Sequence, residues 1–303
     1  MLTIFNQVLI LFAFAAAGFI VAKSGKIKTE HTPLLSGLLV YVIAPLYVFE
    51  TFSKNFTLKY ISGNYEIILW SLGIVLFLGT VMAFMSKLFD KRKYERDVYE
   101  YSLVVPNSGY MGYPMAEAVL GSAGLLNTMI FCLPLSIYIY TIGYSKLTKS
   151  GLSFRKIFNP SMIAMLLGAF AGLFEIPIPS VAYSIMSKAG ACMGPISMLL
   201  AGITISEYDI KELLRNKTSY VITLFRLILI PLALCLILSP FISKEILMIA
   251  VLIYSMPCGL NTIVYPKMIG EDCRPGASMA MISTVCCLAT IPLCMQVLEW
   301  VAK

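Results

Sequence analysis

Two polar segments interrupt apolar stretches of the chain, and both carry residue types that can bind an anion. The first runs from Val105 to Pro114 with the sequence VPNSGYMGYP, and the second runs from Ser255 to Thr262 with the sequence SMPCGLNT. Proline has no N–H and disfavours helical geometry in the residue before it, so each segment is expected to break a helix. The candidate binding residues are Pro106, Asn107, Ser108, Gly109, Tyr110, Pro257, Gly259 and Asn261.

An unwound helix frees backbone N–H and C=O groups, which are tolerated at bilayer depth only where protein or a wet cavity satisfies them. A half-helix that begins near Asn107 directs its positive end at such a cavity, which suits an anionic group. The Asn107 amide can donate and accept, so it can hold a carboxylate and freed backbone together. If the two breaks cross, Asn107 and Asn261 face one another near the membrane centre. The alternative is a pair of Pro-kinked helices whose asparagines bond to neighbouring backbone.

Two charged residues within apolar stretches, Glu117 and Arg226, are candidates for an ion or proton site. Glu117 lies one to two turns beyond the first break, where a carboxylate is a proton-relay or ion-site candidate, unless it is close enough to the outer interface to be hydrated. Arg226 needs a partner or a carboxylate ligand at its depth, unless its long side chain snorkels to the cytoplasmic interface.

The remaining residue types exclude several functions. The single histidine, His31, rules out multi-His metal sites and most His-based catalysis, and the eight cysteines have no metal-ligand spacing. The basic residues are dispersed over short loops without an aromatic platform, which argues against nucleic-acid binding. We therefore expect neither an enzyme nor a bound metal or cofactor.

The elements that must position the two segments are membrane helices. Of the 303 residues, 59% are apolar and only 13% are charged, and the mean hydropathy is +0.84. So little charge cannot cover a water-soluble surface. Helical runs of about 20 apolar residues span a bilayer. We predict ten such spans, at 3–22, 34–52, 66–88, 98–120, 124–146, 158–175, 180–205, 217–238, 245–267 and 276–300.

Charge placement predicts the orientation of these spans. Most of the 23 Lys and Arg residues fall in the loops after spans one, three, five, seven and nine. The positive-inside rule puts those loops in the cytoplasm and both termini outside. No Lys or Arg precedes Lys23, so the first span is expected to remain in the membrane rather than act as a signal peptide.

Proline punctuation repeats across the two halves of the chain. The pairs, at a nearly constant interval, are Pro45 with Pro195, Pro106 with Pro257, Tyr113-Pro114 with Tyr265-Pro266, and Pro134 with Pro292. Five spans per half is an odd number, so the second copy must enter the membrane inverted. Inverted repeats with broken helices near the midplane are typical of secondary transporters. The predicted fold is therefore all-α, with one repeat over 1–150, an inverted one over 151–303, and spans four and nine broken and crossed.

The stretch from Asn107 to Pro114, with Pro257 to Asn261 and the later Ser283-Thr284 to Ile291-Pro292-Leu293, resembles the auxin efflux carrier family of membrane transporters. The resemblance implies a scaffold of spans one, two, six and seven. It also implies a transport domain of spans three to five and eight to ten that carries substrate by an elevator-type motion. Members of bacterial size are linked to organic-acid export and plant members to auxin.

The second motif departs from the plant pattern, in which Asn-Pro-Asn stands at each crossover. Pro106-Asn107 keeps two of those positions, whereas Met256-Pro257-Cys258 keeps only the proline, with Asn261 four residues after it.

These observations predict a secondary transporter in the plasma membrane that exports a small organic anion, either an auxin-like carboxylate or a dicarboxylate. Coupling to H⁺ or Na⁺, or no coupling, stays open, and we expect a homodimer that forms through the scaffold. The alternatives are a sodium-coupled symporter of the bile-acid type, which shares ten spans and crossed helices, and a membrane receptor that does not transport.

Overall fold

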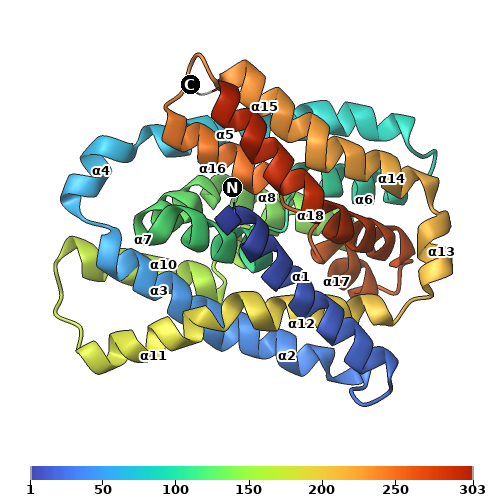
Figure 1. The fold of residues 1–303 in the computed structure, drawn as a ribbon, viewed down its shortest axis with the longest axis horizontal. Helices are drawn as coiled ribbons and strands as arrows, with labels where there is room; N and C mark the ends of the chain where they lie inside the picture. The colour runs from blue at the N-terminus through green and yellow to red at the C-terminus, as the bar shows by residue number, and fades with distance from the viewer. Residues whose placement is uncertain (1, 302–303) are drawn as a thin grey trace.

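The computed structural model describes residues 2–301, apart from the side chains of Ile61 and Ser62, and almost all of this chain is helical (Figure 1). The helices of the first half are α1 (Leu2–Lys23), α2 (Thr32–Leu38), α3 (Ala44–Asn55), α4 (Leu58–Asn64), α5 (Glu66–Met85), α6 (Lys93–Val104), α7 (Tyr113–Phe131), α8 (Leu133–Tyr138) and α9 (Tyr144–Thr148). Those of the second half are α10 (Pro160–Leu173), α11 (Ser180–Ala191), α12 (Met193–Ser206), α13 (Ile210–Arg215), α14 (Lys217–Leu224), α15 (Ile230–Leu238), α16 (Lys244–Tyr254), α17 (Asn261–Met268) and α18 (Arg274–Val301). Over the described residues there is no β-sheet.

Six helical stretches are long and apolar enough to cross a membrane: Leu2–Lys23, Thr29–Asn55, Glu66–Leu88, Ser180–Ser206, Lys217–Leu238 and Arg274–Val301. A seventh is the bent pair Ser108–Phe131 and Leu133–Thr148, whose axes differ by 41°. The predicted sixth span is the shorter helix Pro160–Leu173, and the predicted fourth and ninth are interrupted. The helical membrane class is confirmed, whereas the inverted repeat of ten spans stays a prediction.

Prolines widen several of these helices without ending them. The π-helical turns η2 (Leu39–Ile43), η4 (Ser108–Gly112) and η7 (Phe225–Leu229) are each followed two residues later by a proline, at Pro45, Pro114 and Pro231 respectively. Because proline cannot donate to the carbonyl one turn earlier and its ring crowds that carbonyl, the preceding turn opens.

Gly121 separates the predicted fourth and fifth spans inside α7. Its backbone has φ 73° and ψ −173°, which a residue with a Cβ rarely adopts. The chain can therefore reverse here, and the stretch after Gly121 continues into α8.

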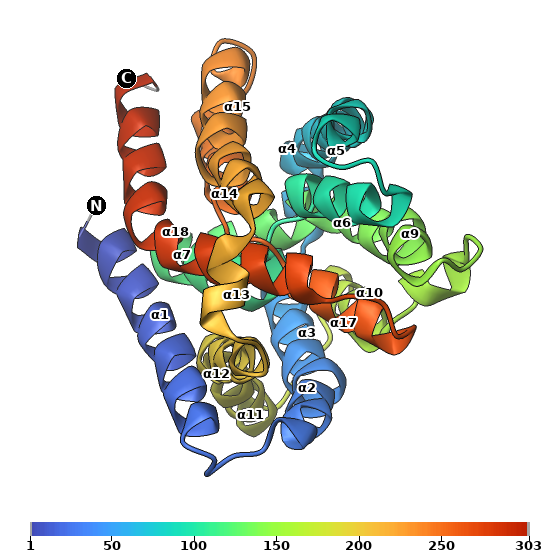
Figure 2. The same ribbon diagram turned by 90° about the vertical axis from the view of Figure 1, so that its right-hand side faces the viewer.

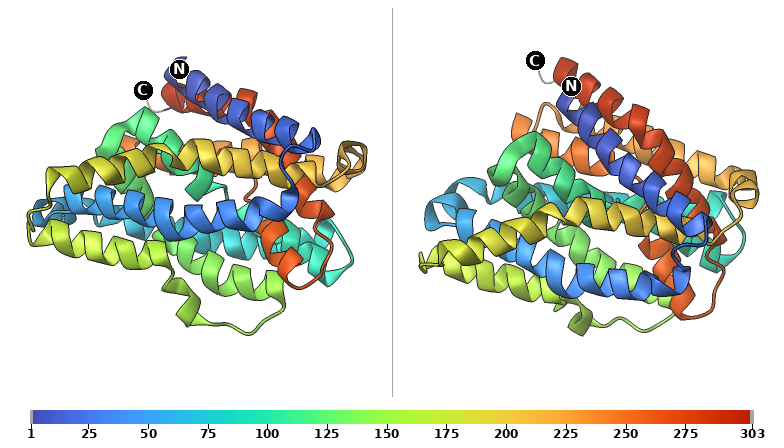
Figure 3. Two further views of the ribbon diagram at one scale, coloured as in Figure 1. Left: turned by 90° about the horizontal axis from the view of Figure 1, so that it is seen from below. Right: turned by 60° about the horizontal axis from the view of Figure 1, so that its bottom comes forward.

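Two sets of helices pack through very close backbone contacts. In the first, α1 lies against α12; in the second, α10 lies against α3. These helices and their neighbours α2 and α11 gather on one side of the molecule (Figures 2 and 3). A Cβ on Gly202 would lie 1.9 Å from the Ala15 carbonyl oxygen, and one on Gly168 would lie 2.7 Å from that of Phe49. Small residues at these positions allow the backbones to approach, as is common between membrane helices.

The loops that carry most of the basic residues lie at one end of the bundle. In Figure 1 the loop after α1, helix α13 and the loop before α6 lie at the right-hand end, while α4 and the α10–α11 loop lie at the left. We call the right-hand end, towards which Figure 2 looks, the basic face.

Substitution Gly202→Ala is expected to destabilise the protein by about 1–3 kcal/mol, because the added methyl group collides with backbone of α1 rather than with a movable side chain. The measurement is thermal unfolding in detergent micelles. The matched control is Gly73→Ala in α5, where no atom lies within 4 Å of the new Cβ, so helix propensity should raise stability by up to about 1 kcal/mol. Equal effects of the two substitutions would contradict the close α1–α12 packing.

Candidate functional site

The two broken segments cross in antiparallel fashion near the middle of the bundle. Pro106 and Cys258 form an isolated antiparallel bridge, and the Asn107 N–H donates to the Pro257 carbonyl at 2.8 Å. On the far strand, the Cys258 N–H donates to Ser283 Oγ of α18 at 3.0 Å. The backbone groups released by each break are thus satisfied largely by the other break and by α18, as bilayer depth requires.

In the first segment, α6 ends at Val104 and a new half-helix begins at Ser108. The Asn107 carbonyl accepts from both Met111 and Gly112, at 3.3 and 3.0 Å, which forms the wide first turn η4. The Tyr110 carbonyl accepts from Ser197 Oγ of α12 at 2.8 Å. Such π turns occur often at functional sites.

In the second segment, α16 ends at Tyr254 and α17 begins at Asn261. The Asn261 side-chain amide donates to the Tyr101 hydroxyl at 2.8 Å, so a residue of α6 orients it. The Thr262 hydroxyl donates to the Gly259 carbonyl at 2.9 Å, which ties the start of this half-helix to the break before it.

A cavity of about 740 Å³ brings the predicted residues of both segments together. All but Pro257 of the eight candidate binding residues line it. Its walls also include the side chains of Tyr113, Tyr140, Tyr265, Met129 and Met193. Among the described residues that line it, Glu207 and Lys267 are the charged ones, and they form an ion pair with each other at 2.7 Å. The cavity therefore offers amides, hydroxyls and aromatic faces, and it extends to Thr32, Asn159 and Lys267 at the basic face.

Arg226 lies directly behind the crossing, on the π turn η7. Its side chain is 0% exposed, so it does not snorkel to an interface. Nη1 donates to the Leu103 carbonyl at 2.9 Å, Nε donates to the Met256 carbonyl at 3.3 Å, and the Tyr254 ring centroid lies 5.2 Å from the guanidinium carbon. The Nη2 atom is buried and has no hydrogen-bond partner.

The helix ends on the two sides of the crossing carry opposite partial charges. The carboxyl ends of α6 and α16, which carry partial negative charge, meet the Arg226 guanidinium. The amino ends of the half-helices that begin at Ser108 and Asn261, which carry partial positive charge, lie at the cavity. One buried arginine thus neutralises two helix ends while the other two helix ends remain available to an anion.

Glu117 lies away from the crossing, near the opposite end of the cavity from Lys267. Its Oε2 atom accepts from the Tyr47 hydroxyl of α3 at 2.5 Å, and Tyr47 itself lines the cavity. Glu117 also lines a smaller pocket of about 250 Å³ with Gln7 and Pro195. The structure therefore does not bring Glu117 together with Asn107 and Asn261, but it does link this carboxylate to the cavity wall.

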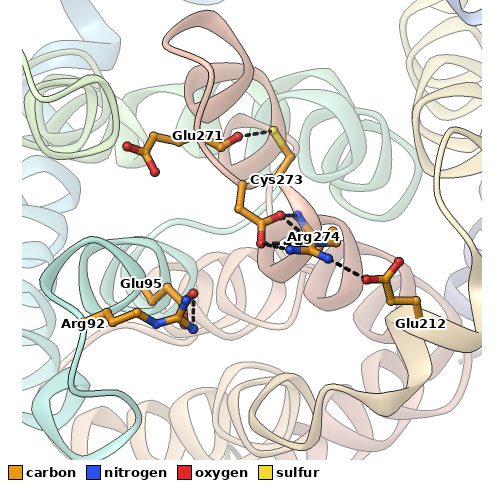
Figure 4. A network of polar contacts seen from close by, with 7 residues as sticks. Arg92, Glu95, Glu212, Glu271, Cys273 and Arg274 are labelled. Atoms are coloured by element: carbon orange, nitrogen blue, oxygen red, sulfur yellow. Dashed lines mark hydrogen bonds and ion pairs between the residues drawn. The ribbon is translucent and has the colours of Figure 1, made fainter.

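A separate polar network covers the basic face (Figure 4). Arg274 at the start of α18 pairs with Glu212 of α13 at 2.7 Å and with Asp272 at 2.8 Å. The hydrogen bonds from Arg274 hold the pKa of Asp272 below its ordinary value. Arg92 pairs nearby with Glu95. None of these five residues is among those that line the cavity, so the network connects loops without forming the site.

Sequence analysis missed Tyr101, Tyr47 and the Lys267–Glu207 pair. Tyr101 and Tyr47 belong to helices distant in sequence from the residues they hold, and a tyrosine in an apolar helix has no distinguishing pattern. Lys267 is one of the loop charges from which the orientation in the membrane was predicted, and no other role was assigned to it. Its distinguishing signal is its position one residue after the Tyr265-Pro266 pair, which places it at the end of the second half-helix.

A polar cavity at the crossing of two broken helices in a helical membrane protein is typical of membrane transporters. The sequence profile of the family described as "Membrane transport protein" matches residues 3–295. The chain therefore belongs to this family, and the resemblance to the auxin efflux carriers is confirmed.

Two archaeal proteins are similar along nearly their whole length. An "Uncharacterized transporter" of Methanocaldococcus jannaschii is 26% identical over 302 residues, which cover 95% of this chain and 96% of the relative. An "Uncharacterized transporter" of Methanothermobacter thermautotrophicus is 23% identical over 298 residues, with the same coverage of both chains. The membership agrees with the expectation that the protein is not an enzyme.

Substitution Arg226→Met is expected to destabilise the protein by about 2–3 kcal/mol, because the carbonyls of Leu103 and Met256 lose charged donors while relief of the buried cation offsets part of that loss. Thermal unfolding in detergent measures the change. The control is Arg215→Met at the exposed end of α13, which should change stability by less than about 0.5 kcal/mol. A loss of stability in Arg215→Met as large as in Arg226→Met would refute the bridging role.

Proposed function

We propose that this membrane transporter exports a small organic anion whose carboxylate binds where the two broken helices cross. The observation that carries this proposal is the crossing itself, because it brings two half-helix amino ends, Asn107 and Asn261 to one cavity. The amino end of a helix binds anions through free N–H groups and partial positive charge. Asn107 and Asn261 add amide donors, and Pro106 and Pro257 maintain the breaks.

The partial positive charge at the cavity favours a ligand with one carboxylate over a ligand with two. Two helix amino ends together provide roughly one positive charge, at about half a charge each. Lys267, the basic residue of the cavity lining, is already paired with Glu207. The walls include six tyrosines and five methionines, which can pack on an apolar or aromatic body. We therefore place a monocarboxylate with an apolar body ahead of a dicarboxylate.

Alternating access in this proposal is an elevator-type motion. The scaffold comprises α1 with α12 and α3 with α10, together with α2 and α11. The support for a rigid scaffold is the close glycine packing in both pairs, which resists sliding. The transport domain comprises α5 to α9 and α14 to α18, and it contains both broken helices. Under the positive-inside assignment, the cavity faces the cytoplasm.

The proposed export does not need sodium. In the runner-up function, a sodium-coupled symporter of the bile-acid type, a cation would bind near the crossing. Here the Arg226 guanidinium already occupies the carbonyls of Leu103 and Met256, so a fixed positive charge stands at that place. Proton coupling through Glu117 stays a second option, because its contact with Tyr47 joins α7 to α3. The homodimer through the scaffold, the plasma-membrane location, the external termini and the receptor alternative stay predictions.

Substitution Asn107→Ala is expected to abolish the thermal stabilisation that phenylacetate gives the purified protein. The ligand-free Tm should stay within about 2 °C, because the hydrogen bonds of Asn107 to Pro257, Met111 and Gly112 are made by its backbone, which alanine keeps. The control is Asn64→Ala at the end of α4, which should retain the full stabilisation. If Asn107→Ala binds phenylacetate as the unchanged protein does, the site lies elsewhere.

A flux measurement in proteoliposomes tests the substrate class and the coupling. Labelled phenylacetate is expected to move faster than labelled succinate, without a requirement for sodium, because the site balances about one negative charge. Sodium-dependent flux would instead support the symporter, and flux that rises with a proton gradient and falls in Glu117→Gln would support proton coupling. Binding without any flux would support the receptor.

A further inference from the structure

The mouth of the cavity at the basic face holds one ion pair. Lys267 Nζ at the end of α17 lies 2.7 Å from Glu207 Oε2 at the end of α12. Both residues line the cavity, and their side chains are 57% and 16% exposed respectively. An anion that reaches the crossing from the basic face must pass this pair.

The pair connects the two bodies that the proposed motion separates. Helix α12 is held against α1, where Cβ atoms on Gly202 or Gly18 would meet backbone oxygens. Helix α17 is held instead against α18, where a Cβ on Gly276 would lie 2.1 Å from the Thr262 carbonyl oxygen. It also meets α9 through the rings of Tyr265 and Tyr144, whose centroids lie 5.0 Å apart. Relative motion of the two bodies must therefore break the Lys267–Glu207 contact.

We propose that Lys267 is the first contact of the organic anion and that its ion pair with Glu207 is a latch, which holds the cavity open to the basic face until the anion displaces Glu207. This inference rests on the proposed function, because it assumes that the ligand is an anion. The substrate carboxylate takes the place of Glu207 as the partner of the ammonium, so Lys267 stays paired, while the released Glu207 carboxylate is hydrated at the mouth of the cavity. Once Glu207 is released, α17 is free to move relative to α12.

The ion pair between Lys267 and Glu207 is weak enough for another carboxylate to replace Glu207. An exposed ion pair contributes little net stability, so a second carboxylate can compete for the ammonium without a large penalty. Another charge close to α12 at this end is Lys23, whose ammonium donates to the carbonyls of Ser206 and Tyr208 at 3.0 and 3.2 Å. Lys23 thus holds the end of α12 in place but does not line the cavity.

The first experiment measures the apparent Kd of phenylacetate by thermal-shift titration in detergent. Lys267→Gln is expected to weaken binding about three- to tenfold, because one attractive charge is lost. Glu207→Gln is expected to tighten binding by about threefold, because Lys267 is then free of its competing partner. A purely structural pair predicts shifts in the same direction for both substitutions, so that result, or no shift in either, would overturn the first-contact role.

The matched controls are Glu212→Gln and Arg274→Gln, which remove another exposed ion pair of the basic face. Neither residue lines the cavity, so both variants should keep the Kd of the unchanged protein. A change in Kd equal to that of Lys267→Gln would show that only the general field of this face matters, and would overturn the proposal.

The second experiment needs no ligand and tests the latch independently of the proposed function. A thiol introduced as Ser36→Cys lines the cavity. Its rate of labelling by a polar maleimide is read at position 36 by peptide mass spectrometry, because Cys192 and Cys286 are also exposed, and it reports how often the cavity is open. Both Glu207→Gln and Lys267→Gln should slow this labelling about threefold, since the open state loses its latch, whereas Arg274→Gln should not. Unchanged labelling would overturn the latch. If phenylacetate and succinate fail to bind the unchanged protein, the proposed function fails for these probes while the labelling result stands.

Discussion

The structure depends on satisfying the backbone groups that two helix breaks release inside an apolar bundle. Unpaired N–H and C=O groups are costly at membrane depth, so a lone break would be unstable. Here the two breaks satisfy each other through the antiparallel contact of Pro106–Asn107 with Pro257–Cys258, and α18 adds Ser283. A proline at each break removes a donor that would otherwise need a partner. Because each break supplies hydrogen-bond partners to the other, neither would be stable alone. The contact therefore joins α6, α7, α16 and α17 into one unit.

Arg226 determines which helix ends remain available. An unpaired guanidinium in a bilayer core is unfavourable, and this one has no carboxylate contact among the described residues. The carboxyl ends of α6 and α16 compensate it with carbonyl dipoles. As a result, the partial positive charges at the amino ends of the half-helices that follow are not cancelled by the nearby carboxyl ends of α6 and α16. In the proposed function, selectivity for an anion would therefore follow from helix direction rather than from a basic side chain at the crossing.

The crossing could be predicted from the sequence because its determinants are local. Pro106 and Pro257 break helices wherever they stand, and the adjacent Asn107 and Asn261 mark polar groups in apolar surroundings. Arg226 was recognisable as a charge within an apolar stretch, but its partners are backbone carbonyls, which every residue has, so no pattern could identify them. The contacts of Tyr101 with Asn261 and of Tyr47 with Glu117 join helices far apart in the chain, and only the packing of those helices creates them. The same holds for Lys267, whose charge was interpreted as orientation alone.

The two ends of the cavity differ, and this difference indicates to which side of the molecule the cavity is open. Towards the basic face, the walls reach the loops and the polar contact is an exposed ion pair between α12 and α17. Towards the other end, Tyr47 of α3 closes on Glu117 of α7 through a short hydrogen bond at the edge of a second, smaller pocket. Both contacts connect the helices with close glycine packing to the broken helices, and both must rearrange if the cavity is to open on the opposite side. A hydrogen bond to a carboxylate and an exposed ion pair are individually weak compared with the buried crossing. The boundary between the two sets of helices is therefore the part of the molecule most easily rearranged, and in the proposed elevator motion the crossing would move as an intact unit.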